Sequence, residues 1–287
     1  MKKYKICRIL LVILAIFLCV AFYELLGICV AYKKQPEVSN TTKKETKNGS
    51  WNECSENTER AVIIEKNPEA LLQRVRLIKN AKKEIILSTF AFQSDESGKL
   101  ILGALHDAAD RGVHIRLLVD GMESWIDMEG NPYFYGLSSH ENVEIKLYNK
   151  ANPLKPWKMM GRMHDKYLIA DGKRYILGGR NTYNYFLGDF PGHKNYDRDV
   201  LVVCDEPEKE NSVNQLLEYF ETIWEQEDSG YFHDNKKLAN RKSVKNAVLE
   251  LQNGYQKYFE ENKERICDTD YTDETFETEK IALVSNP

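Results

Sequence analysis

The chain has 287 residues, of which 42% are hydrophobic and 29% charged, enough for one large domain or two small ones with a sizeable core. Its formal net charge is −4 and its pI is about 6.0. This acidic balance argues against a general nucleic-acid binder, because such proteins carry a basic excess that neutralises phosphates. The cysteines form no CxxC or Cys/His cluster, which leaves the sequence without a zinc signature.

Residues 1–32 predict a membrane anchor. Residues 9–32 are apolar except for Glu24, and a helix of that length crosses a hydrocarbon layer of ~30 Å at ~1.5 Å per residue. A cleaved signal peptide is the alternative, but its apolar region is usually ~7–15 residues long and a small-residue cleavage site follows it. Since no such site is evident, we expect an uncleaved, single-pass anchor.

The orientation of this anchor depends on the basic residues that flank it. Lysines and an arginine stand on both sides, so the charge rule nearly cancels and only slightly favours an extracytoplasmic domain. Cys54, Cys204 and Cys267 lie outside the anchor at wide spacing. Two of them can form a disulfide only in an oxidising compartment, and the sequence leaves that open.

A polar linker is expected at 33–60, followed by a domain at 61–266 in which helices and strands alternate. A helix from Asn67, a strand at 84–90, a helix at 96–111 and a strand at 113–121 form a β-α-β crossover, which requires parallel strands. Further strands are predicted at 143–149, 166–171, 174–179 and 199–205, and helices at about 207–226 and 243–261. The predicted fold class is α/β: a mixed, mostly parallel sheet flanked by helices and preceded by one transmembrane helix.

The C-terminal residues 267–287 are expected to lie outside this domain. Residues 267–280 are acidic and indicate a loop, whereas 281–287 have the pattern of a strand that the end of the chain cuts short. We interpret the segment as an acidic tail and the truncated start of a second half.

The residues that suggest chemistry lie between 163 and 181. On a strand from His164, the side chains of His164 and Lys166 project from the same face. Asp171-Gly172 predicts a turn into the next strand, which brings Gly179 and Asn181 near the same end. Imidazole, ammonium and amide groups suit attack on a phosphodiester, which needs a nucleophile, an acid and donors for phosphate oxygens.

This stretch resembles the phospholipase D superfamily motif HxKxxxxD, followed after six residues by GGxN. The matching residues are His164, Lys166, Asp171, Gly178, Gly179 and Asn181. Residues 88–121 also look like the opening of these domains, and 151–166 resemble the bacterial cardiolipin-synthase-like branch. The resemblance extends over about residues 61–205.

The resemblance implies that His164 is the nucleophile that forms a phosphohistidine, or else the acid that protonates the leaving group. Lys166 and Asn181 would bind phosphate oxygens, and Gly178 and Gly179 would shape the pocket floor. Asp171 would complete the catalytic set; in this family that residue is more often structural or orienting. It implies neither a metal nor a cofactor. The expected function is phosphodiester cleavage or phosphatidyl transfer on a phospholipid, with the membrane as partner.

The family's active site normally combines two such motifs, whereas this chain has one. We therefore expect a homodimer that completes the site, or a truncated two-motif protein. The alternatives are a homodimeric nuclease of the same type, which the acidic balance disfavours, and an inactive half-enzyme or binding partner. The structural alternative for the motif is a solvated edge strand that ends in an Asp-Gly turn.

Two other features permit two interpretations each. A basic run before the motif, interrupted by Trp157 and Met159, either faces a membrane or headgroup or is an ordinary solvated surface; it comprises Lys150, Lys155, Lys158 and Arg162. His193 lies in a loop, where a lone histidine is more often simply exposed.

Overall fold

The structure is a computed structural model of the chain. It describes residues 2–33, 40, 43–44, 59–204, 206, 211–233, 235–279 and 281–283. Most of the expected linker at 33–60 therefore lies outside the described residues, as does Cys54. Cys267 is a free, exposed thiol.

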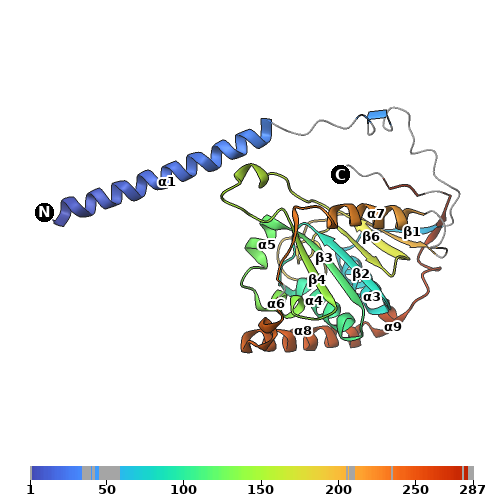
Figure 1. Ribbon diagram of the computed structural model, residues 1–287. Coiled ribbons are helices and arrows are strands. Elements are labelled where there is room, and N and C mark those ends of the chain that lie inside the picture. The colour runs from blue at the N-terminus through green and yellow to red at the C-terminus, as the bar shows by residue number, and fades with distance from the viewer. Residues whose placement is uncertain are drawn as a thin grey trace.

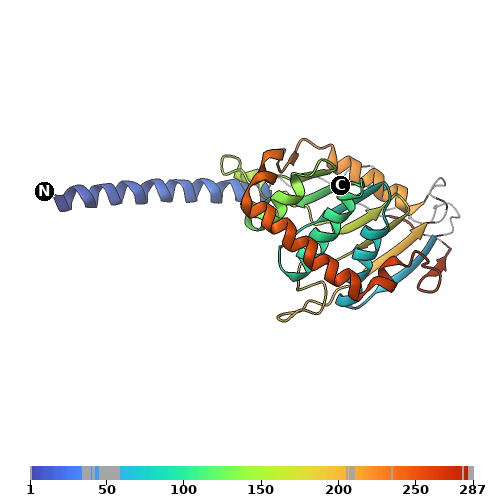
Figure 2. The same ribbon diagram turned by 90° about the horizontal axis from the view of Figure 1, so that it is seen from below.

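Helix α1 (Lys2–Lys33) projects away from the rest of the molecule, as Figures 1 and 2 show. Within Tyr4–Lys33, the most apolar window of 18 residues has a mean hydropathy of 2.9, and none of that window is buried in the protein. Among the described helices it is the one long and apolar enough to cross a membrane. The expected N-terminal apolar helix is thus confirmed.

The domain is built on one open sheet of nine strands in the order β8-β4-β3-β2-β5-β6-β7-β1-β9. The strands are β1 (Glu59–Ile64), β2 (Glu84–Thr89), β3 (His114–Asp120), β4 (Val143–Tyr148), β5 (Tyr167–Ala170), β6 (Arg174–Gly178), β7 (Asp199–Cys204), β8 (Ser229–Tyr231) and β9 (Phe276–Thr278). The α/β class and the mixed sheet are confirmed. The expected predominance of parallel pairing is wrong, because only β2, β3 and β4 run parallel and all other pairs are antiparallel.

Helices cover both faces of this sheet (Figure 1). The helices of the domain are α3 (Asn67–Asn80), α4 (Glu96–Asp110), α5 (Gly121–Asp127), α6 (Pro132–Ser138), α7 (Ser212–Trp224), α8 (Lys242–Glu261) and α9 (Lys263–Cys267), with 3-10 turns η2 (Pro156–Lys158) and η3 (Lys236–Asn240). Along β2, Ile85 and Leu87 pack into the core shared with α3, α4 and α8, whereas Ile86 points to the α7 side. Strands buried on both faces explain the continuous apolar runs in the sequence.

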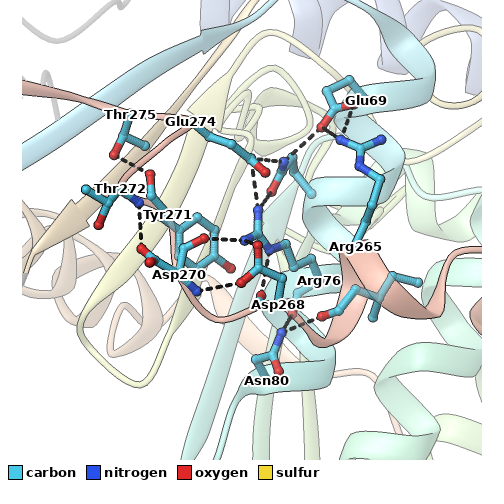
Figure 3. A network of polar contacts seen from close by, with 12 residues as sticks. Glu69, Arg76, Asn80, Arg265, Asp268, Asp270, Tyr271, Thr272, Glu274 and Thr275 are labelled. Carbon is cyan, nitrogen blue, oxygen red and sulfur yellow. Dashed lines mark hydrogen bonds and ion pairs between the residues drawn. The ribbon is translucent and has the colours of Figure 1, made fainter.

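The acidic C-terminal segment is irregular over 268–275, as expected of a loop, but it is bound to the domain and contains the short strand β9. Figure 3 shows it gathered around Arg76 of α3, whose side chain is only 1% exposed. The guanidinium contacts the carboxylates of Asp268 and Glu274 at 3.1 and 2.9 Å, donates to the backbone carbonyl of Asp270 at 2.7 Å, and lies 3.9 Å from the centre of the Tyr271 ring.

This anchoring lets the tail add a strand to the sheet. Strand β9 pairs with β1, with Phe276 opposite Ala61. Residues 281–283 are irregular instead of forming the expected strand, and 284–287 lie outside the described residues. Within the described part of the chain, the tail therefore supplies an edge strand of the sheet.

We expect Arg76→Met to lower the free energy of unfolding by about 3 kcal/mol, the scale of losing charge-assisted hydrogen bonds in a buried setting. Urea unfolding of the full chain in detergent, followed by circular dichroism, measures this loss. Arg265→Met is the matched control, because Arg265 pairs with Glu69 at the surface and such pairs contribute about 0–1 kcal/mol. Unchanged hydrogen exchange over 268–278 in Arg76→Met would show that Arg76 does not hold the tail.

Candidate active site

The candidate site lies at the edge of the sheet where the parallel strands end. Asp120 ends β3, Phe90 follows β2, and His164 precedes β5, which runs antiparallel to β2 and so begins at the same edge. Strand β5 begins only at Tyr167. His164 and Lys166 thus lie on the approach to the strand, a correction of the expected strand from His164.

The His164 side chain is exposed at this edge. Its ring centre lies 4.7 Å from that of Phe90 in an edge-to-face contact, and within the described part of the chain no side chain hydrogen-bonds to the ring. Partial burial, helped by the nearby Lys166 ammonium group, lowers the pKa of His164 below its usual value of 6.5. The imidazole is therefore neutral near pH 7, the form that can attack phosphorus.

Lys166 is a buried cation beside this imidazole. The residue is 5% exposed, and its Nζ donates to the backbone carbonyl of His164 at 2.6 Å. No carboxylate of the described residues forms an ion pair with it, although Asp165 and Asp197 are near enough to act on it electrostatically. Burial lowers the pKa of the ammonium group. Because an ammonium group has three donors, it keeps hydrogens for a bound anion.

A buried carboxylate fixes the chain just before His164. Asp120 is 1% exposed and accepts from the backbone N–H of Met163 at 3.1 Å and from Arg162 Nε at 2.9 Å. It also caps α5 through the N–H groups of Met122 and Glu123. The guanidinium of Arg162 in turn lies 4.9 Å from the centre of the Phe90 ring.

Asp165, between His164 and Lys166, points to the opposite face of the sheet. Its carboxylate accepts a hydrogen bond of 2.8 Å from the Tyr219 hydroxyl on α7, and burial raises its pKa. The hydrogen bond with Tyr219 keeps this carboxylate out of ion-pair contact with Lys166.

Asp171 lies away from the other predicted catalytic residues. Its carboxylate accepts from the backbone N–H groups of Lys82, Lys83 and Glu84 at 2.7 to 3.1 Å, where the chain enters β2. It follows the last residue of β5, whereas His164 precedes the first. At ~3.3 Å per extended residue the two are up to roughly 23 Å apart. The structure does not bring Asp171 together with His164 and Lys166.

The two glycines of the motif allow the chain before β7 to pass close to the end of β6. A Cβ on Gly178 would overlap the Asp199 carboxylate, and one on Gly179 would overlap the Asp197 carboxylate. Asn181, 7% exposed, accepts from the backbone N–H of Ala91 at 3.2 Å and so ties this segment to the chain after β2.

Beneath Gly178, Asp199 forms a fully buried charge cluster with two arginines. Its Oδ2 lies 2.9 Å from Arg74 and 3.2 Å from Arg180, and these side chains are 0–5% exposed. Arg180 also donates to Asn67 and to the backbone carbonyls of Ile64 and Glu65. Asp197 also acts electrostatically on Arg180, so two carboxylates face the two arginines beneath the site.

Sequence reasoning missed several residues of this arrangement: Phe90, Asp120, Asp197 and the cluster of Arg74, Asp199 and Arg180. The signal for Asp120 was present, since it ends the predicted strand 113–121 directly before a glycine, where parallel strands place functional groups. Asp197 had a weaker signal, a carboxylate directly before the strand that follows GGxN. Arg74 and Arg180 had no sequence signal, because nothing in a single sequence pairs them with Asp199.

Other candidate features lie outside this centre. His193 is exposed, and its ring hydrogen-bonds to Asn195 at 2.9 Å. A cavity of about 760 Å³ adjoins the site through Asp197 and is lined by both signs of charge, among them Lys66, Lys194 and Asp189. Among the described residues, no group of three His, Cys, Asp or Glu side chains is placed to hold a metal ion.

Residues 74–224 match the family described as "Cardiolipin synthase, PLD-like domain", over just more than half of the chain. The chain belongs to the phospholipase D superfamily. Superfamily members are phosphodiesterases or phosphatidyltransferases. The matched range of this phospholipase D-like chain contains all six motif residues and the parallel strands β2 to β4.

Individual proteins show similarity to parts of this phospholipase D-like chain. An uncharacterized protein of Helicobacter pylori strain J99 is 30% identical over 212 residues, which cover 69% of this chain and 39% of that protein. Cardiolipin synthase C of Escherichia coli K12 is 29% identical over 171 residues, covering 55% and 34%. The structure of NucT from Helicobacter pylori superposes with a TM-score of 0.48 at 18% identity, covering 61% and 99%. The chain thus spans about two fifths or less of the length of these curated relatives.

The position of Asp171 generates a prediction that separates a structural role from a catalytic one. We expect Asp171→Ala to lower the free energy of unfolding by about 2 kcal/mol, roughly one charge-assisted hydrogen bond, because the exposed N–H groups of Lys82 and Lys83 can turn to water. Turnover per folded molecule should stay within a few-fold of wild type. Loss of turnover on the scale of His164→Ala, with stability unchanged, would contradict this assignment.

Proposed function

We propose that the chain cleaves or transfers the phosphodiester of a phospholipid headgroup through a covalent intermediate on His164. The region 61–266 would be the catalytic half and residues 1–32 the anchor that holds it at its substrate. The observation that carries this proposal is Lys166, a buried ammonium group without a carboxylate ion pair among the described residues, next to a neutral, exposed imidazole.

Such a pair supports the binding of an anionic phosphodiester. A buried cation without a counter-ion is costly, and a phosphate oxygen would relieve that cost at the point where the reaction must occur. Lys166, with Asn181 at the rim of the site, would hold the non-bridging oxygens.

The reaction then follows in two displacements. A ring nitrogen of His164 attacks phosphorus, the bond from phosphorus to the headgroup oxygen breaks, and the departing alkoxide takes a proton from an acid. Water or a second alcohol next attacks phosphorus, gives its proton to the same group acting as base, and breaks the P–N bond. Water yields phosphatidic acid, whereas the hydroxyl of another phosphatidylglycerol yields cardiolipin.

The acid in this scheme would be His164 of a second copy. One ring cannot be the neutral nucleophile and the protonated acid in the same step, so the second His164 would act as an imidazolium whose proton the anionic phosphodiester beside it stabilises. An isologous dimer presents the same edge of the sheet twice and would bring the two imidazoles to opposite sides of one phosphorus.

Turnover on vesicles tests the proposed reaction. The full chain in phosphatidylglycerol vesicles should release glycerol and form cardiolipin or phosphatidic acid, and His164→Ala should lower the rate roughly a thousandfold or more, the scale of removing a catalytic nucleophile. His193→Ala is the matched control and should leave the rate unchanged, since its ring contacts only the 193–195 loop and Tyr185. Equal rates for wild type and His164→Ala, or His164-dependent cleavage of DNA in place of lipid, would overturn the proposal.

A mixing experiment tests the shared site. If each site needs two His164 rings, wild type mixed with an equal amount of His164→Ala should give about a quarter of the activity of wild type at the same total protein, because random pairing leaves that fraction of intact dimers. Chains that act alone would give about a half. Co-expression of two differently tagged chains ensures that the subunits mix, and cross-linking reports the dimers.

A further inference from the structure

Five large apolar side chains are exposed on two segments beside the candidate site. Trp125 and Ile126 belong to α5, and Leu154, Trp157 and Met160 belong to the chain around η2. Their exposed fractions are 64%, 67%, 78%, 44% and 49%. Together they form what we call the apolar rim. Large exposed apolar groups gathered in one place mark a surface that another molecule or a membrane covers.

The two segments of the apolar rim are linked to each other and to the site. Arg162 lies between η2 and His164, and its guanidinium contacts Glu123 of α5 at 2.9 Å and Asp120 at 2.8 Å. The apolar rim therefore borders the same edge of the sheet from which the His164 ring is exposed.

Helix α1 contacts the apolar rim directly. The Tyr23 hydroxyl donates to the backbone carbonyl of Leu154 at 2.7 Å. Gly27 packs so closely against Pro156 of η2 that a Cβ on Gly27 would overlap the proline ring. Figures 1 and 2 both show α1 leaving the domain on the side of α5 and the chain between β4 and β5.

The level of this contact along α1 determines where the apolar rim lies relative to a bilayer. Gly27 is five residues before the end of the apolar stretch at Tyr32, or ~8 Å at ~1.5 Å per residue. Interfacial helices bury their apolar faces to a similar depth, roughly 5–10 Å below the headgroup boundary. A spanning α1 would thus bring η2 into the boundary between headgroups and acyl chains.

We propose that the apolar rim inserts into the surface of a phospholipid bilayer next to α1. Tryptophan is well suited to that boundary, and the exposed Lys155 nearby can reach anionic headgroups. The insertion would hold the His164 edge at headgroup level. The proposal requires that α1 spans the membrane, but it does not require that the site is catalytically active.

Tryptophan fluorescence tests the insertion in the full chain, because α1 contains no tryptophan. The four tryptophans are Trp51, Trp125, Trp157 and Trp224, and Trp224 is only 4% exposed. In vesicles of phosphatidylglycerol and phosphatidylcholine brominated near the carbonyl end of the acyl chains, we expect strong quenching. The Trp125→Phe/Trp157→Phe double variant should lose most of it, whereas Trp51→Phe should keep it.

Alkaline extraction of the same vesicles reports separately whether α1 is inserted. With α1 inserted, equal fluorescence in brominated and unbrominated vesicles would overturn the proposal, as would full quenching in the double variant. Rim tryptophans shielded from both bromine and aqueous acrylamide would show that a second copy covers the apolar rim instead, which also overturns it. This experiment does not measure turnover. The quenching result can therefore be interpreted even if the proposed reaction does not occur.

Discussion

The site depends on a cation that the fold buries without a carboxylate ion pair among the described residues. Lys166 is 5% exposed and donates to a main-chain carbonyl. An isolated buried charge is expensive, so a fold keeps one only where the surrounding structure is stable enough to hold it. Its presence next to a neutral histidine is the reason for proposing an anionic ligand at this edge of the sheet.

The carboxylates around the site form hydrogen bonds or ion pairs with groups other than Lys166. Asp120 binds Arg162 and the backbone before His164, Asp165 binds the Tyr219 hydroxyl, and Asp199 lies between two arginines. Each carboxylate thereby holds a piece of backbone or a neighbouring helix in place. Of these three carboxylates, Asp165 lies near enough to act on Lys166 electrostatically, and its hydrogen bond joins it to Tyr219 instead.

The motif and most strands could be predicted from sequence because they rest on local signals. Spacing alone singled out His164 and Lys166, and the apolar run at 84–90 predicted β2 within one residue. The Asp171-Gly172 turn predicted the antiparallel pairing of β5 with β6. The directions of β5 against β2 and of β7 against its neighbours could not be inferred, because strands buried on both faces have similar apolar runs whether parallel or antiparallel. Asp171 was placed in the catalytic set by the motif alone, although the predicted turn already put it at the other end of the strand from His164.

Contacts between distant segments were beyond sequence reasoning altogether. Arg76 resembles any helical arginine, yet it binds a segment about 190 residues further along and so converts an apparent acidic loop into part of the sheet. Phe90 resembles a strand-end core residue, yet its ring contacts the rings or charged groups of Arg162, His164 and Lys166. Such roles depend on packing across the sheet, which no periodicity encodes.

The position of α1 restricts how two copies can share a site. Helix α1 contacts the apolar rim, and Arg162 links the apolar rim to the chain just before His164. If both copies insert α1 into one bilayer from the same side, the two-fold axis that relates their His164 rings must run along the membrane normal. Any other direction would point one anchor away from the lipid. A dimer built in this way would hold its shared phosphorus at headgroup height, so the anchor, the apolar rim and the paired motif would all favour a substrate that arrives within the membrane plane.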